Sequence, residues 1–320
     1  MLRFRLNVKL FATCLIFSIH IAFGQQIEER VDVELVQVDL IATDSKGRLV
    51  HDLTAGDFVL KENGKVRSIT HFYNSAVEES RYPLAMSFLV DTSFSMHEKV
   101  AGLTRIGVAV QAAELVMTQL KTDDQIELIE FNNKPDAIVP FTSDMESVRE
   151  KFKTLDFREA NTAMRDAILF ALERIQGRPG RNIIVIFSDG MDSASKSIEE
   201  DVVEAMRKSD ATFIAFYSEF ARLNVPGGAM TGSSNTNRIL IRAGEDTMRM
   251  FTEMSGGEFF SFTKEHELLM ALENFRSFVK GQYTLAYPPS SQERSGWRKI
   301  KIECKRKGIK LKYREGYWAP

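Results

Sequence analysis

The hydrophobic positions of the chain fall into two kinds of pattern, which predict two kinds of structure. In residues 27–77, and again beyond residue 282, apolar and polar residues alternate, as in strands with one buried face. In residues 82–280, short continuous apolar runs are separated by segments whose apolar residues recur every three or four positions. The runs predict strands buried on both faces, and the segments predict amphipathic helices. Predicted strands and helices alternate six times along this region. Such an alternation predicts an α/β fold with a doubly wound, mostly parallel sheet and helices on both faces.

Local signals place the ends of several of these elements. Ser143-x-x-Glu146 and Ser197-x-x-Glu200 have the spacing of capping boxes, so each is expected to open a helix. Residues 219–243 are rich in glycine, serine and asparagine and are interpreted as a long surface insertion. Other helices are expected near residues 103–120 and 162–176, and two more are expected to end near residues 254 and 280. Strands are expected at residues 84–90, 126–131, 137–140, 182–189, 212–217 and 258–262.

The two flanks of this region are predicted to be β structure. In the first flank the apolar alternation changes phase between Leu35 and Val36, which indicates a bulge or a strand that uses both faces. Asn63-Gly64 is a strong hairpin signal, and three further strands are expected after residue 282. Each flank is too small for a stable core of its own, so the two are predicted to pack together as one β module.

The N-terminus has the three zones of a secretory signal peptide. Arg3, Arg5 and Lys9 precede an apolar stretch over residues 10–23, and Gly24 follows as a small residue at a cleavage point. The expected division is therefore signal peptide 1–24, N-terminal β region 25–78, α/β domain 79–281 and C-terminal β region 282–320. The protein is expected to be exported, periplasmic or secreted, with no stable membrane span after cleavage, because the apolar stretch is short for a span.

Composition narrows the function classes. With 44% hydrophobic and 27% charged residues and a formal charge of −2, the chain is an ordinary globular protein and not a general nucleic-acid binder. Cleavage after Gly24 would leave Cys304 as the one cysteine, so no internal disulfide is expected. A basic set near the C-terminus is interpreted as a solvated face that keeps strand edges from aggregating, although an anionic partner is the alternative. Its members are Arg298, Lys299, Lys301, Lys305, Arg306 and Lys307.

The candidate chemistry lies where the predicted strand at residues 84–90 ends, in Asp91-Thr92-Ser93-Phe94-Ser95. Ligands of open α/β sheets bind at the carboxyl ends of the strands. One carboxylate and two hydroxyls at alternate positions are hard oxygen ligands, which suit Mg²⁺ or Mn²⁺. The alternative is a Ser/Asp turn that caps the next helix. The five residues alone do not separate these interpretations.

Two more oxygen donors complete a recognisable set. Asp189 ends the apolar run at residues 182–189, and Thr162 lies at a loop-to-helix junction. With Asp91, Ser93 and Ser95, they resemble the metal-ion-dependent adhesion site of the von Willebrand factor type A (VWA) domain. The resemblance extends from about residue 82 to 280. One departure is Ala160-Asn161, where that family often has two glycines. The flanks DLTAGDFVLKENGK and WRKIKI…REGY look like the exported bacterial, acidobacterial-type VWA-related proteins.

The resemblance implies roles for the five residues. Ser93, Ser95 and Thr162 would touch the ion, and Asp91 and Asp189 would hold it through water. A carboxylate from a protein partner would fill the remaining position, so the expected function is a cation-dependent binding module without catalytic or cofactor-binding residues. Asp166 and Asp192 have helix-face and capping explanations, and the five histidines make no metal-ligand spacing.

The sequence leaves open two alternative functions besides the binding module. One is a Mg²⁺-dependent phosphoryl-transfer hydrolase with Asp91 as nucleophile. It lacks a phosphate-binding Gly-rich motif, and Ser93 stands where a haloacid-dehalogenase-like phosphatase carries its second Asp. The other is a metal-free structural scaffold. The binding module is the better supported, with an unidentified protein partner that offers an acidic residue.

Overall fold

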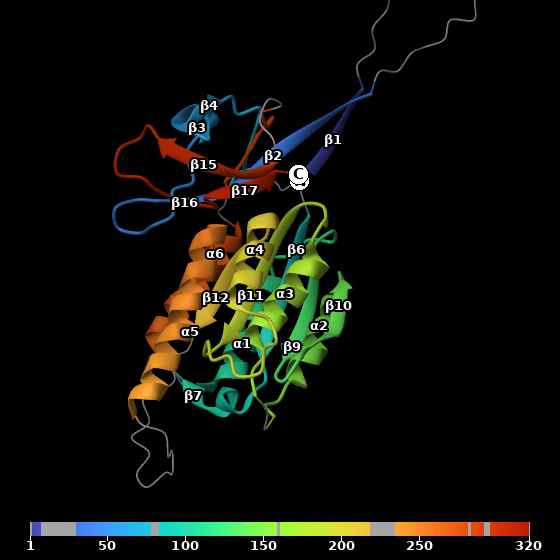
Figure 1. Cartoon of the computed structure of the whole chain (residues 1–320), viewed down its shortest axis with the longest axis vertical. Coiled ribbons are helices and arrows are strands. Elements are labelled where there is room, and N and C mark those ends of the chain that lie inside the picture. Colours follow the sequence, from blue (N-terminus) through green and yellow to red (C-terminus); the bar gives the residue numbers. More distant parts are fainter. Residues whose placement is uncertain are drawn as a thin grey trace, which may run out of the picture.

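The computed structural model describes residues 2–7, 30–77, 83–100, 102–158, 161–217, 234–280, 283–290 and 295–319. It consists of an α/β domain with a smaller β module at one end of its sheet (Figure 1). The α/β domain comes from the middle of the chain, and the β module comes from both flanks. The predicted fold class is confirmed in both parts.

The central sheet is made from the strands with the most continuous apolar runs. Every residue of strands β6, β11 and β12 is buried, as expected for strands covered by helices on both faces. Neighbouring strands are parallel, except that β10 returns from β9 as an antiparallel edge strand. Within the described residues, the sheet has six strands, in the spatial order β10 (Pro135–Thr142), β9 (Gln125–Phe131), β6 (Leu84–Asp91), β11 (Arg181–Ser188), β12 (Thr212–Tyr217) and β13 (Phe259–Ser261).

The helices cover both faces of this sheet. Apolar residues of α1 (Arg105–Met117), α2 (Met145–Lys153) and α6 (Glu265–Lys280) join the core cluster on one face. Those of α3 (Met164–Ile175), α4 (Glu199–Lys208) and α5 (Ser234–Ser255) join the cluster on the other. This three-layer arrangement is the doubly wound fold that the alternating pattern predicts. A short ribbon of β7 (Lys99–Val100) and β8 (Leu103–Thr104), with the 3₁₀ turn Phe94–His97, connects β6 to α1.

The β module joins strands that lie far apart in the sequence. Strand β2 pairs with β14 and β16, and β3 pairs with β15, so both flanks contribute to both of its sheets. Their inward side chains form one core that includes Leu40, Leu60, Tyr283 and Ile302. The strands are β2 (Arg30–Thr43), β3 (Phe58–Glu62), β4 (Lys65–Arg67), β5 (His71–Asn74), β14 (Tyr283–Tyr287), β15 (Gly296–Cys304), β16 (Lys310–Tyr313) and β17 (Gly316–Ala319), with the 3₁₀ turn Ala55–Asp57 before β3.

The α/β domain is inserted between two neighbouring strands of the β module. Asn74 of β5 pairs with Tyr283 of β14, so the chain leaves the module and returns to it at adjacent points. Strand β2 uses both of its faces, because Val38 and Leu40 face the module core while Ile41 packs into the core of the α/β domain. The prediction of a strand that uses both faces is therefore confirmed.

Polar and close backbone contacts hold the two parts together. The Arg181 side chain donates to the carbonyl of Val279 at 3.1 Å and lies 3.6 Å from the Asp39 carboxylate in the module. Gly256 has a φ of +73°, and a Cβ there would lie 2.4 Å from the carbonyl carbon of Tyr313. Glycine is therefore required where the α/β domain meets strand β16.

Both predicted capping boxes are wrong by one residue. Asp144, not Ser143, caps α2, because its carboxylate accepts from the Ser147 amide at 3.2 Å. A carboxylate is a strong N-cap acceptor, so Asp144 takes the position that the Ser143-x-x-Glu146 pattern assigns to its neighbour Ser143. At α4 the cap is Ile198, whose amide donates to Asp201 at 3.0 Å.

Three other details differ from the predictions. Residues 234–243 belong to helix α5, so the predicted insertion at 219–243 is too long, and residues 218–233 lie outside the described part. The C-terminal flank forms a fourth strand, β17. Arg298 is buried in the module against Glu62 and is not part of the solvated face; the other members of the basic set that are described are exposed.

The structure describes little of the predicted signal peptide. Residues 8–29, with the predicted cleavage point, lie outside the described residues. Residues 2–7 form strand β1 (Leu2–Asn7), which pairs antiparallel with the first part of β2. Over the described residues, no helix has both the length and the apolar character needed to cross a membrane.

Candidate metal centre

Two carboxylates come from the ends of neighbouring strands. Asp91 is the last residue of β6, and Asp189 follows directly after β11, which runs parallel to β6 in the middle of the sheet. Both side chains are completely buried. The site therefore lies at the carboxyl edge of the sheet, where open α/β sheets bind their ligands.

Hydrogen bonds fix both carboxylates. Asp91 accepts from the Ser93 amide at 2.9 Å through Oδ1 and from the Ser188 hydroxyl at 2.8 Å through Oδ2. Asp189 accepts from the Met191 amide at 3.1 Å through Oδ1. Because Ser188 directly precedes Asp189, its hydroxyl links the two strand ends.

The two serines lie together beside Asp91. Their Oγ atoms are 3.3 Å apart, and the 3₁₀ turn Phe94–His97 keeps this spacing, since the Met96 amide donates to the Ser93 carbonyl at 3.0 Å. Ser93 is the N-cap residue of this turn, but its side chain makes no capping hydrogen bond. The hydroxyls are thus not consumed by the capping role that was the alternative interpretation.

Thr162 is held at the same edge by a separate set of contacts. Its amide donates to the Ser193 hydroxyl at 3.1 Å, and its carbonyl accepts from the amides of Ser193 and Ala194. The next residue, Ala163, donates to the carbonyl of Asn132, whose side chain donates to the Thr92 hydroxyl at 3.1 Å. Through Asn132, the Thr162 loop is connected to the loop that carries Asp91. The structure thus joins Asp91 with Ser93, and Ser93 with Ser95, by direct contacts, and connects Thr162 to them indirectly.

The charges of the two carboxylates act on each other. Burial and the negative charge of Asp189 raise the pKa of Asp91 to about 7, against the hydrogen bonds from Ser93 and Ser188, which lower it. Two buried carboxylates without enough positive charge favour a bound cation. Together with the three hydroxyls they form a set of hard oxygen donors that fits Mg²⁺ or Mn²⁺. No cluster of three or more His, Cys, Asp or Glu suited to a metal occurs in the described part of the chain, so the hydroxyls are essential to this candidate site.

The raised pKa predicts a pH dependence for the metal-free protein. The ordinary pKa of Asp91 is 3.8, so between about pH 4 and pH 7 the folded state keeps a proton that the unfolded state releases. Stability in EDTA should therefore fall as the pH rises through this range, by on the order of 3 kcal/mol. Denaturant unfolding at pH 5 and pH 8 would measure it. Asp91→Asn should lack this component, and parallel profiles for the two proteins would contradict the assignment.

The other acidic and histidine candidates have structural explanations. Asp166 accepts from the amides of Lys196 and Ser197, and Asp192 accepts from the amides of Arg165 and Ser195. The ring of His97 lies 4.4 Å from that of Phe157 on the exposed rim of the site. These contacts agree with the capping and surface roles expected for them.

Sequence reasoning missed two residues that contact the candidate ligands. Ser188 is the last residue of β11, and its position beside Asp189 is a usable signal. Arg105 opens helix α1 and has a side chain that reaches Asp189. A charged residue at the start of an apolar helix is usually exposed, so periodicity gives no sign of its burial.

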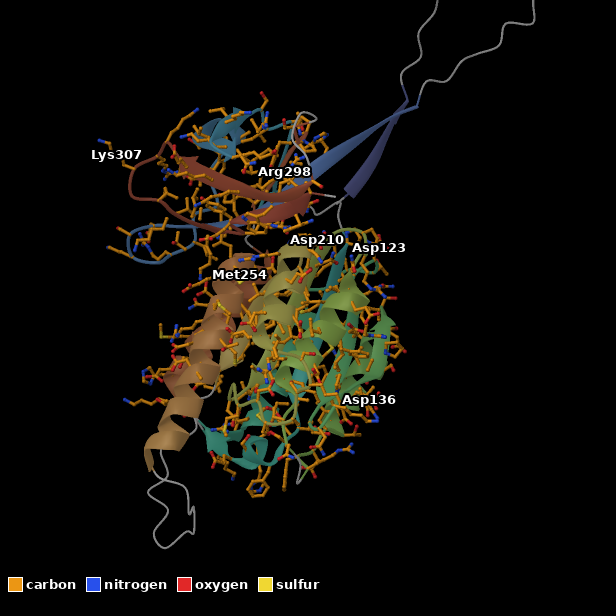
Figure 2. The ribbon with its side chains drawn as sticks, in the orientation of Figure 1. Asp123, Asp136, Asp210, Met254, Arg298 and Lys307 are labelled. Atoms are coloured by element: carbon orange, nitrogen blue, oxygen red, sulfur yellow. The ribbon has the colours of Figure 1, made fainter. Side chains whose placement is uncertain are left out.

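The candidate site and the β module lie at opposite ends of the α/β domain. The ribbon of β7 and β8, next to the Asp91 loop, is at the end remote from the module (Figure 1). In Figure 2, Asp123 and Asp210 lie at the end of the α/β domain that faces the module. Asp136, in β10, lies nearer the opposite end of the domain. The β module therefore leaves this edge of the sheet uncovered.

A doubly wound α/β domain with carboxylate and hydroxyl donors at the carboxyl edge of its sheet is the class that this fold and site define. Residues 86–191 match the sequence model of the von Willebrand factor type A domain. The chain therefore contains a VWA domain, as the motif resemblance implies. The matched range includes all five candidate metal ligands.

Individual proteins show more distant similarity. A UPF0353 protein of Mycolicibacterium paratuberculosis is 24% identical over 229 residues, which cover 67% of this chain and 65% of that relative. Among solved structures, the conserved hypothetical protein BatB from Bacteroides thetaiotaomicron is 17% identical with a TM-score of 0.46, covering 61% of this chain and 98% of its own. A von Willebrand factor type A structure from Catenulispora acidiphila is 11% identical with the same TM-score, covering 87% and 71%. The acidobacterial-type grouping stays a prediction.

Proposed function

We propose that this protein is an exported, divalent-cation-dependent protein-binding module. Asp91, Ser93, Ser95, Thr162 and Asp189 hold Mg²⁺ or Mn²⁺, and an acidic side chain of a protein partner completes its coordination. The observation that carries the proposal is the pair of buried carboxylates beside two hydroxyls 3.3 Å apart, at the carboxyl edge of a VWA sheet. When bound, the ion supplies positive charge to which a partner carboxylate can attach.

The same geometry argues against a role for Asp91 as a nucleophile. The side chain is completely buried, and its two oxygens accept hydrogen bonds from Ser93 and Ser188. A nucleophilic carboxylate has to approach the reacting atom of its substrate, which this enclosure prevents. We therefore propose a binding function without catalysis.

The test combines metal titration with partner capture. Calorimetry with the mature chain should detect one Mg²⁺ or Mn²⁺ site, and a pull-down from envelope extract should recover a partner in Mg²⁺ but not in EDTA. Ser95→Ala should weaken both, whereas Ser209→Ala, a serine at the opposite end of the domain that borders the β module, should change neither. Metal-independent recovery of the same partner would contradict the proposal.

An exposed aromatic side chain beside the metal ligands predicts part of the partner contact. Phe94 is 58% exposed between Ser93 and Ser95, and its ring lies 6.1 Å from that of Phe157. Partner affinity in Phe94→Ser should fall by about tenfold, since exposed aromatics near the centre of an interface contribute strongly. Mg²⁺ binding measured without the partner should be unchanged. Equal partner affinity would mean that the partner does not contact this side of the site.

Export predicts a defined mature N-terminus. The basic, apolar and small-residue zones meet at one junction, so the mature chain should begin near residue 25 and be periplasmic or secreted. N-terminal sequencing of protein from the native cell would measure this. Recovery of chains that keep Met1 would contradict export by a cleaved signal peptide.

A further inference from the structure

A buried arginine lies against the candidate metal site. Arg105 is the first residue of helix α1, and its side chain is 2% exposed. One guanidinium nitrogen, Nη1, lies 3.3 Å from Asp189 Oδ2 and donates to the Ser95 carbonyl at 3.0 Å. The other, Nη2, lies 3.2 Å from Glu98 Oε2. The side chain thus bridges the two strand ends that provide the predicted ligands.

The position of Arg105 is fixed at both ends. Its backbone amide donates to the Glu98 carbonyl at 3.2 Å, so backbone and side chain are both bound to the same glutamate. The Thr104 hydroxyl caps the helix that Arg105 opens, by accepting from the Gly107 amide at 3.0 Å. Because the helix start is anchored, the guanidinium can change its partners only by a change in its own side-chain torsions.

The guanidinium supplies part of the positive charge that the site needs. Asp91 and Asp189 are completely buried and carry two potential negative charges, and Arg105 offsets one of them. A divalent ion bound to Asp91 and Asp189 would repel the Arg105 guanidinium. The ion and the guanidinium would also compete for the Asp189 carboxylate. Glu98 offers the guanidinium a second carboxylate, at the other nitrogen, Nη2.

We propose that Arg105 is the built-in counter-ion of the metal site and determines its affinity for divalent cations. Without metal, the guanidinium shares its charge between Asp189 and Glu98. When the ion binds, the guanidinium loses its contact with Asp189 and keeps its contacts with Glu98 and the Ser95 carbonyl. The proposal rests on the proposed metal-binding function, and it goes further by naming one residue that lowers the affinity for the ion.

The direct test is the affinity for Mg²⁺ alone, measured by calorimetry on the mature chain. Arg105→Gln should bind Mg²⁺ about tenfold more tightly or better, because a unit charge a few ångströms from a cation opposes its binding even at a moderate local dielectric. The matched control is Arg158→Gln. This variant also removes one positive charge close to the Asp91 loop, because the Arg158 amide donates to the carbonyl of Thr92. The Arg158 side chain, however, is 62% exposed and paired with Glu130. Its Mg²⁺ affinity should stay within about twofold of the wild type, because exposed charges are screened.

A second variant keeps the test decisive if Arg105→Gln does not fold. Glu98 is partly exposed, so Glu98→Gln is the milder change. It removes the alternative carboxylate, so the guanidinium remains on Asp189 and Mg²⁺ affinity should fall. Thermal unfolding adds an independent measurement: Arg105→Gln should be less stable than wild type in EDTA but should gain more from saturating Mg²⁺.

The outcomes separate this inference from the proposed function. If the wild type binds Mg²⁺ and Arg105→Gln binds it no more tightly, the counter-ion role is wrong and the metal site stands. If Arg105→Gln binds Mg²⁺ strongly and the wild type only weakly, both are supported. If neither folded protein binds Mg²⁺ or Mn²⁺, both are wrong. Where only Glu98→Gln folds, unchanged or tighter binding overturns the counter-ion role.

Discussion

Asp91→Asn should abolish stabilisation of the protein by Mg²⁺ while leaving the fold intact. Binding of an ion to the folded state alone stabilises it by about 2.7 kcal/mol at a concentration 100 times Kd, and the variant should lose this gain. In EDTA near pH 8 the variant should be at least as stable as the wild type, because it removes one of two buried carboxylate charges. Thermal or denaturant unfolding with and without Mg²⁺ measures both effects.

Asp166→Asn is the matched control for this experiment. It makes the same carboxylate-to-amide change near the same edge of the sheet, where Asp166 accepts from the amides of Lys196 and Ser197. It should lower stability slightly and keep the full response to Mg²⁺. Equal Mg²⁺ stabilisation of the wild type and Asp91→Asn would mean that the ion binds elsewhere, and the assignment of the five ligands would be wrong.

Glu62→Ala should destabilise the protein by about 3–5 kcal/mol, the usual cost of leaving one partner of a buried ion pair alone. Glu62 is completely buried in the β module, 3.2 Å from Nη1 of Arg298. It also accepts from the Tyr317 hydroxyl at 3.4 Å. Denaturant unfolding of Glu62→Ala and of the wild type measures the cost.

An exposed ion pair in the same sheet provides the control for Glu62→Ala. Glu303 of β15 contacts Lys61 and Lys301 at the surface. Glu303→Ala should leave the unfolding midpoint almost unchanged, because exposed pairs are hydrated and screened. If the two alanine variants unfolded at the same midpoint, the Glu62–Arg298 pair would not be important for stability.

The strands that were predicted best are those whose residues are all buried and mostly apolar. Strand β12 has the bounds that the sequence predicts, and β6 and β11 are close to them, because a buried run between turn signals has few alternatives. The hairpin at Asn63-Gly64 is confirmed for a local reason: both residues have positive φ, of 47° and 80°.

The predictions failed where distant contacts decide the outcome. Nothing near Arg298 in the sequence indicates that Glu62, from the other flank, meets it inside the module. Arg105 is a similar case, since its side chain is buried against Asp189, which follows strand β11 and lies 84 residues further along the chain.

The helix caps failed for a smaller reason. At α2 two adjacent polar residues, Ser143 and Asp144, compete for one position. At α4 the backbone places Ile198 at the cap, although its side chain cannot accept a hydrogen bond.

The insertion of the VWA domain between β5 and β14 also determines the order in which the protein can be completed during synthesis. Strands β2 to β5 are made first, but β14 to β17 follow the whole VWA domain. The Leu53 amide, for example, donates to the Tyr283 hydroxyl across 230 residues of sequence. The β module therefore cannot close until the last strands leave the ribosome or the export machinery, and such long-range pairing is slow. Until then the edges of β2 and β3 that pair with these strands are open, so this part of the nascent chain needs protection from aggregation for the longest time.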